Sequence, residues 1–143
     1  MSALELLLIS GSIAGMATDI LHRKISNKLC FGILLTCLLL AFFEQKLQLH
    51  VYQSLSVVAI GLVLFYFGIL GAGDTKLFSA YALIIDTQYF SLTILIISFL
   101  GAITALVILA MQFISENKTN KGVPYGVPIV VASLFSIYLS KLN

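Results

Sequence analysis

Six apolar stretches separated by short polar segments make up most of this chain. They predict helices over residues 3–21, 29–43, 51–70, 74–87, 90–113 and 127–142. A membrane-spanning helix needs roughly 20 apolar residues, and there are too many long apolar runs here for the core of a soluble protein. The pattern therefore predicts an all-α, polytopic bundle of six transmembrane helices, with the lipid bilayer around it and residues 1–143 in a single domain. The second and fourth stretches are short for a crossing, which predicts snorkelling lysines, local thinning of the bilayer or burial inside the bundle.

The composition agrees with a membrane protein and excludes other classes. Of the 143 residues, 60% are hydrophobic and 10% are charged, which leaves no room for a separate soluble domain. The formal net charge is only +2, and no basic patch is interleaved with aromatic residues, so a nucleic-acid partner is excluded. Cys30 and Cys37 form neither a CxxC pair nor a zinc-binding pattern, and we interpret them as packing residues. No histidine or cysteine cluster predicts a metal site, and no cofactor is expected.

Positive charges gather in the connections at one side of the predicted bundle. This side carries Arg23, Lys24, Lys28, Lys76, Lys118 and Lys121, whereas the other carries Lys46 and Lys141 together with Glu44 and Asp86. Because Lys and Arg are enriched in cytoplasmic loops, the N-terminus is predicted to lie outside the cytoplasm. No positive charge precedes the first stretch, so we expect it to be retained as a helix and not cleaved as a signal peptide. Asp19 and Asp74 then lie at the cytoplasmic ends of their helices.

Two aspartates border the apolar stretches. Asp74 ends the segment Gly71-Ala72-Gly73-Asp74 between two apolar runs, and Asp19 lies at the end of the first run. A carboxylate at membrane depth is costly enough to indicate a functional site. If packing brings the two together, they share a proton, so that one activates water while the other protonates a substrate carbonyl. The positive end of a helix dipole favours an anion at Asp74, so we assign Asp74 as the base and Asp19 as the acid.

The residues around the aspartates have alternative interpretations. Gly71 and Gly73 carry no side chain, so a substrate backbone could approach Asp74, but the segment is also typical of an interhelical turn with Asp74 as the N-cap. Lys76 either stabilises an ionised Asp74, contacts a substrate, or is a snorkelling lysine. Asn27 either bonds to the loop that frames Asp19 or caps the second helix.

Three motifs taken together resemble those of one family. They are Asp19 with Arg23, Ile25 and Asn27, then Gly71-Ala72-Gly73-Asp74-Thr75-Lys76, then Pro124-Tyr125-Gly126. In this order and spacing they resemble the prepilin peptidases, a family of intramembrane aspartyl proteases. By itself Pro124-Tyr125-Gly126 predicts only a rigid turn before the last helix, and Arg23 only an orientation charge.

The resemblance implies an activity and a site. It makes Asp19 and Asp74 the catalytic pair and implies site-shaping or substrate-binding roles for Gly71, Gly73, Lys76, Arg23, Asn27, Pro124, Tyr125 and Gly126. It further implies removal of the short basic leader from pilin-like precursors at the cytoplasmic face of a prokaryotic inner membrane, in type IV pilus or protein secretion systems. The chain lacks the extra cytoplasmic region of the members that also methylate their product. It is therefore similar to the short peptidases of tight-adherence (Flp-type) pilus systems or to archaeal preflagellin peptidases.

Two other functions compete with a protease. A small proton-coupled transporter would also use intramembrane carboxylates, but it predicts them near the bilayer midplane and often in repeated halves. Here both aspartates lie toward one face, and no internal repeat is visible. A non-catalytic subunit of a secretion system is the second alternative, and a cleavage assay separates it from a peptidase.

Overall fold

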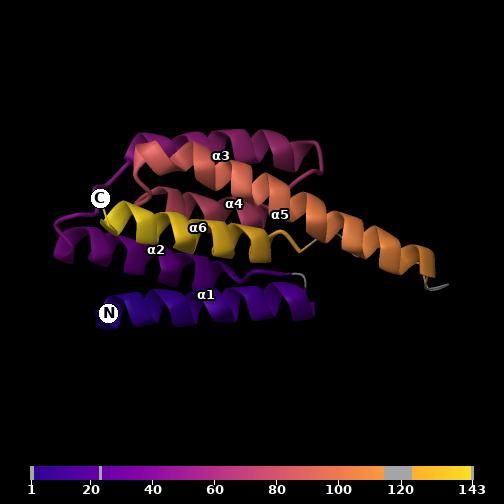
Figure 1. Cartoon of the computed structure of the whole chain (residues 1–143), viewed down its shortest axis with the longest axis horizontal. Coiled ribbons are helices and arrows are strands. Elements are labelled where there is room, and N and C mark those ends of the chain that lie inside the picture. The colour runs from indigo at the N-terminus through magenta and orange to yellow at the C-terminus, as the bar shows by residue number, and fades with distance from the viewer. Residues whose placement is uncertain (1, 23, 115–123, 143) are drawn as a thin grey trace.

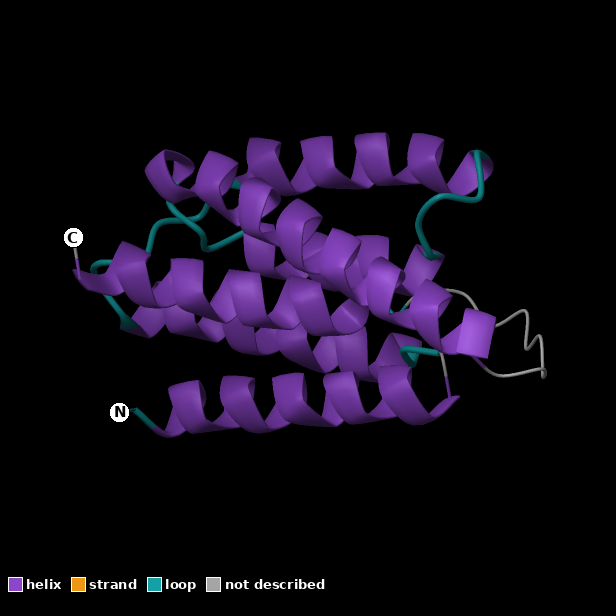
Figure 2. Cartoon of the chain, turned by 45° about the vertical axis from the view of Figure 1, so that its right-hand side comes forward, coloured by secondary structure: helices purple, strands orange, loops and turns teal. Residues whose placement is uncertain are grey.

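The structure is a computed structural model that describes residues 2–22, 24–114 and 124–142 (Figure 1). Its helices are α1 (Ala3–His22), α2 (Asn27–Phe43), α3 (Val51–Tyr66), α4 (Ala72–Ala82), α5 (Thr87–Ile114) and α6 (Gly126–Leu142). No strand occurs among the described residues, which confirms the predicted all-helical class (Figure 2).

Two of the described helices are long and apolar enough to cross a membrane by length and composition. These are α1 and the segment Thr87–Gln112 of α5. The helices α2, α3 and α6 are apolar but have only 16 or 17 residues, about 24 to 26 Å at 1.5 Å per residue. The prediction of six crossings with the N-terminus outside therefore remains a prediction.

The short helix α4 lies at the centre of the bundle. It packs against α2, α3 and α6, while α1 packs against α2 and α6, and α5 packs against α6. Leu77, Tyr81 and Ala82 of α4 are completely buried, and the Tyr81 hydroxyl forms a 2.6 Å hydrogen bond with Ser12 of α1. Of the ways to accommodate a helix too short for a crossing, the structure uses burial among its neighbours. At the start of α4, Asp74 and Thr75 are buried, whereas Ala72 is exposed.

The third and fourth helices end earlier than the hydrophobic pattern predicts. The predicted span 51–70 ends at Tyr66, and a turn follows in which Gly68 has φ of +71°, a conformation that favours glycine. This turn redirects the chain into α4. Periodicity could not locate this end, because the residues of the turn are as apolar as those of the helix.

The predicted span 74–87 begins at Ala72 and ends at Ala82, because tertiary contacts satisfy the backbone groups there. The side-chain amide of Gln53 in α3 donates to the carbonyls of Ala82 and Ile85, both at 3.0 Å. The Asp86 carboxylate then accepts the N–H of Gln88 at 3.1 Å, and α5 begins there instead of at residue 90. The polar side chains of Gln53 and Asp86 thus separate α4 from α5, and the hydrophobic pattern of the sequence does not predict this break.

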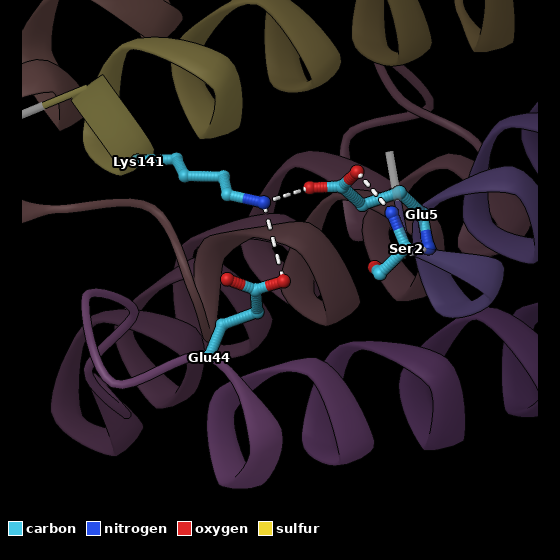
Figure 3. A network of polar contacts seen from close by, with 4 residues as sticks. All are labelled: Ser2, Glu5, Glu44 and Lys141. Carbon is cyan, nitrogen blue, oxygen red and sulfur yellow. Dashed lines mark hydrogen bonds and ion pairs between the residues drawn. The ribbon is translucent and has the colours of Figure 1, made fainter.

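The ends of three helices are joined by an ion-pair cluster (Figure 3). Lys141 near the end of α6 pairs with Glu5 of α1 and with Glu44 at the end of α2, the latter at 3.2 Å. The Ser2 backbone N–H donates to Glu5 at 2.9 Å. Because the three side chains are partly exposed, each pair contributes about 1 kcal/mol or less. The cluster lies at the opposite end of α1 from Asp19, so it fixes the bundle without entering the aspartate site.

Candidate active site

Asp74 lies in the first turn of α4 and is only 9% exposed. Gly71 is the N-cap, with extended backbone angles (φ −75°, ψ 146°), and Asp74 is the third residue of the helix. Its carboxylate folds back toward the Gly71 backbone. The interpretation of Asp74 as the N-cap is therefore wrong, because Gly71 holds that position. A side chain at Gly71 would also crowd the carboxylate, since its Cβ would lie 2.8 Å from Asp74 Oδ2.

Asp19 lies in the last turn of α1 and is 5% exposed. Its Oδ2 atom accepts a 2.8 Å hydrogen bond from the backbone N–H of Gly126, the first residue of α6. The approach is close enough to require glycine, because a Cβ at position 126 would lie 2.6 Å from Asp19 Oδ2. The structure thus brings the last sequence motif to the first, across more than a hundred residues of chain.

The two aspartates occupy the same end of the bundle. One comes from the C-terminal end of α1 and the other from the N-terminal end of α4, which places the two carboxylates near each other. Asp19 accepts a hydrogen bond from the backbone N–H of Gly126, and the Asp74 carboxylate lies against Gly71. Two nearly buried carboxylates at the same end of the bundle are the groups that an acid/base pair requires.

Gly73 packs against the connection between α1 and α2. A Cβ on Gly73 would lie 3.3 Å from the Cβ of Ile25, and the Cys30 thiol donates a weak hydrogen bond to the Gly73 carbonyl at 3.9 Å. The side of Gly73 that lacks a side chain thus faces Ile25. The structure gives this glycine a packing role, and it gives Cys30, which is buried as expected, a contact with the segment that carries Asp74.

Lys76 and Asn27 form a hydrogen bond with each other. The Lys76 ammonium donates to Asn27 Oδ1 at 3.0 Å, and both side chains are exposed. Asn27 does not cap α2, because Ser26 is the N-cap and accepts the N–H of Leu29 at 3.2 Å. The pair instead connects the start of α2 to α4, at a residue two positions after Asp74.

Of the remaining predicted site residues, the structure describes Pro124 and Tyr125. Pro124 and Tyr125 are half-buried, and the Tyr125 ring lies so close to α5 that a Cβ on Gly101 would approach its Cε1 atom to 2.9 Å. Arg23 lies outside the described residues.

Sequence reasoning did not identify two contacts that support the site. Thr75 packs on Gly61 of α3, where an added Cβ would lie 2.1 Å from Thr75 Cγ2, and Tyr125 packs on Gly101 of α5. A glycine within an apolar helix commonly marks a close helix contact in membrane proteins, so Gly61 and Gly101 could have been identified as contact positions from the sequence. The residues that they contact could not, because only the fold brings those residues together.

Comparison with known proteins gives one match. The model of the type IV leader peptidase family matches residues 6–106, more than two thirds of the chain. The match includes Asp19 and Asp74, whereas Pro124-Tyr125-Gly126 lies beyond it. No curated protein and no solved structure matches the chain. A leader peptidase is consistent with a membrane protein that has long apolar helices. This chain belongs to the type IV leader peptidase family.

Proposed function

We propose that this protein is an aspartic endopeptidase that removes the short basic leader from pilin-like precursors. The observation that carries the proposal is the pair Asp19 and Asp74, two nearly buried carboxylates at the same end of the bundle. The family supports a leader peptidase. The exposed Lys24, Lys28 and Lys76 border the same end of the bundle, so the loop surface beside the aspartates is basic.

In the proposed reaction the two carboxylates share one proton. The ionised Asp74, at the positive end of the α4 dipole, takes a proton from water as the water oxygen attacks the scissile carbonyl. The protonated Asp19 donates its proton to the carbonyl oxygen. When the tetrahedral intermediate collapses, the carbon–nitrogen bond breaks and Asp74 returns its proton to the leaving amine, while Asp19 recovers its proton from the intermediate. One water is consumed for each peptide bond cleaved.

A transporter is not favoured by this geometry. Asp19 lies in the last turn of α1 and Asp74 in the first turn of α4, so both are at one end of the bundle. A proton-coupled transporter places its carboxylates near the midplane.

Cleavage of a precursor by the purified protein tests the function. We expect a pilin-like precursor incubated with the protein in detergent to lose its leader as one fragment, because a single site cuts at a single bond. Mass spectrometry of the mature product measures its new N-terminus. An intact precursor after prolonged incubation with folded protein would exclude a peptidase and leave the non-catalytic subunit as the better explanation.

The site is proposed to face the cytoplasm, with six crossings of the cytoplasmic membrane and the N-terminus outside. Lys28 is the second residue of α2, at the aspartate end, and Lys46 follows α2 at the opposite end. In a background without Cys30 and Cys37, a cysteine at position 28 should react with an impermeant maleimide only after the cells are permeabilised. A cysteine at position 46 should react in intact cells. The reverse pattern of labelling would invert the topology and contradict the cytoplasmic site.

A further inference from the structure

An apolar groove of about 450 Å³ lies between α3, α4 and α5. Its walls include Ile60 and Leu64 of α3, Phe78 of α4, and Ile94 and Ile97 of α5. None of the described residues that line it is charged. It is separate from the aspartates themselves, and the proposed reaction does not use it.

One end of the groove meets the aspartate site. Thr75, which follows Asp74, lines the groove, and so does Tyr125, which precedes the Gly126 whose N–H binds Asp19. Thr75 is thus next in the chain to the catalytic Asp74, and Tyr125 is next to the residue that binds Asp19, so the wall of the groove adjoins both carboxylates. A molecule in the groove would reach the catalytic pair at this end.

The groove extends from the site along the bundle. Its wall covers Ser56 to Leu64 on α3 and Phe90 to Ala102 on α5, roughly 12 Å and 18 Å at the helical rise per residue. Because α3 leads into α4 and α5 leads toward α6, Leu64 and Ala102 lie toward the aspartates, and Ser56 and Phe90 lie far from them. In Figures 1 and 2, α5 begins beside α3 and diverges from it toward the end where α5 leaves the bundle. The groove therefore fits two to three turns of a helix.

We propose that this groove binds the apolar helix that follows the scissile bond of the precursor. The inference rests on the proposed function and names where that function holds its substrate. Backbone groups cannot remain unpaired in lipid, so an apolar segment that enters from the membrane does so as a helix. The uncharged wall suits such a segment. The small side chains of Ser56, Ser98 and Ala102 allow two helices to approach closely.

The hydroxyl groups on the wall do not prevent apolar packing. Ser56 Oγ donates to the Tyr52 carbonyl at 2.8 Å, and Ser98 Oγ donates to the Ile94 carbonyl at 2.9 Å. Both hydroxyls are bonded within their own helices, so an apolar helix can cover them without leaving a donor unpaired. The helix would lie along α3 and α5 with its first residue at Thr75 and Tyr125, and the peptide bond before it would then lie at the aspartates.

The test compares two alanine-to-phenylalanine variants. Ala102 lines the groove near the aspartates, whereas Ala59 of α3 is exposed but does not line it. We expect Ala102→Phe to lower kcat/KM for a full-length precursor by about tenfold or more, mainly through KM, because lost docking contacts weaken binding. Ala59→Phe should cleave the precursor at the rate of the unmodified protein. Equal rates for all three proteins would overturn the groove as the docking site.

Cross-linking provides a second measurement that needs no bulky side chain. In a background with Cys30→Ala and Cys37→Ala, a cysteine at position 98 or 102 should cross-link to a cysteine in the apolar segment of the precursor. A cysteine at position 59 should not. Precursor cleavage without a cross-link from the groove, and with unchanged kcat/KM in Ala102→Phe, would mean that lipid fills the groove, while the proposed peptidase would stand. Failure of the unmodified protein to cleave any precursor would remove the proposed function and the docking site with it.

Discussion

Asp19→Asn and Asp74→Asn are each expected to reduce leader removal by about 10³-fold or more. Asparagine keeps the size of the side chain, and at position 19 its oxygen can still accept the backbone N–H of Gly126. It cannot take up or donate the shared proton. Because the two carboxylates act as one unit, the double variant should be little worse than either single variant. The measurement is the rate of precursor cleavage per folded molecule in detergent.

Asp86→Asn is the matched control. Asp86 is a half-buried carboxylate at the start of α5, where it accepts the N–H of Gln88. The same substitution there removes a charge without touching the aspartate pair, so the cleavage rate should not change. Size-exclusion profiles of all variants show whether the bundle remains folded. Substantial cleavage by either Asp19→Asn or Asp74→Asn would contradict the paired-aspartate mechanism.

The existence of the helices followed from the sequence, but several of their ends did not. All six predicted stretches contain a helix, because a helix satisfies the backbone groups of an apolar run within the run itself. The ends of α3 and α4 depend on a glycine with positive φ and on the Gln53 amide that reaches the carbonyls of Ala82 and Ile85. Contacts between distant segments leave no periodic signal, so hydropathy extended both helices too far.

In the candidate site, too, the residues that stand out in their local sequence could be predicted, whereas contacts between distant segments could not. Asp19 and Asp74 could be identified from the sequence, because a carboxylate at the edge of an apolar run is conspicuous. The contact of Lys76 with Asn27, and the contact of Gly73 with Ile25, join segments whose pairing no spacing predicts. Lys76, Asn27 and Gly73 each had two or more interpretations in the sequence, and none of these interpretations named the partner that the fold supplies.

Gly126→Ala is expected to lower the cleavage rate by about 10²-fold while leaving the protein folded. The added Cβ would lie 2.6 Å from Oδ2, 3.0 Å from Cγ and 3.1 Å from Cβ of Asp19. The whole side chain of Asp19 must therefore move, and rotation of the carboxylate alone does not relieve the contact. A displacement of about 1 Å at a catalytic group is enough to cost about 10²-fold in rate. Loss of the 2.8 Å hydrogen bond from the Gly126 N–H would add to the effect.

Gly32→Ala separates this local effect from a general effect of replacing glycine in a helix. Gly32 lies inside α2, and a Cβ there meets nothing within 4 Å. Alanine at that position should raise stability by up to about 1 kcal/mol and leave the cleavage rate unchanged. Thermal unfolding in detergent and precursor cleavage per folded molecule, measured for both variants, distinguish displacement of Asp19 from loss of folded protein. If Gly126→Ala cleaved as fast as the unmodified protein, the contact between Gly126 and Asp19 would not belong to the active arrangement, and the acid role of Asp19 would lose its positioning partner.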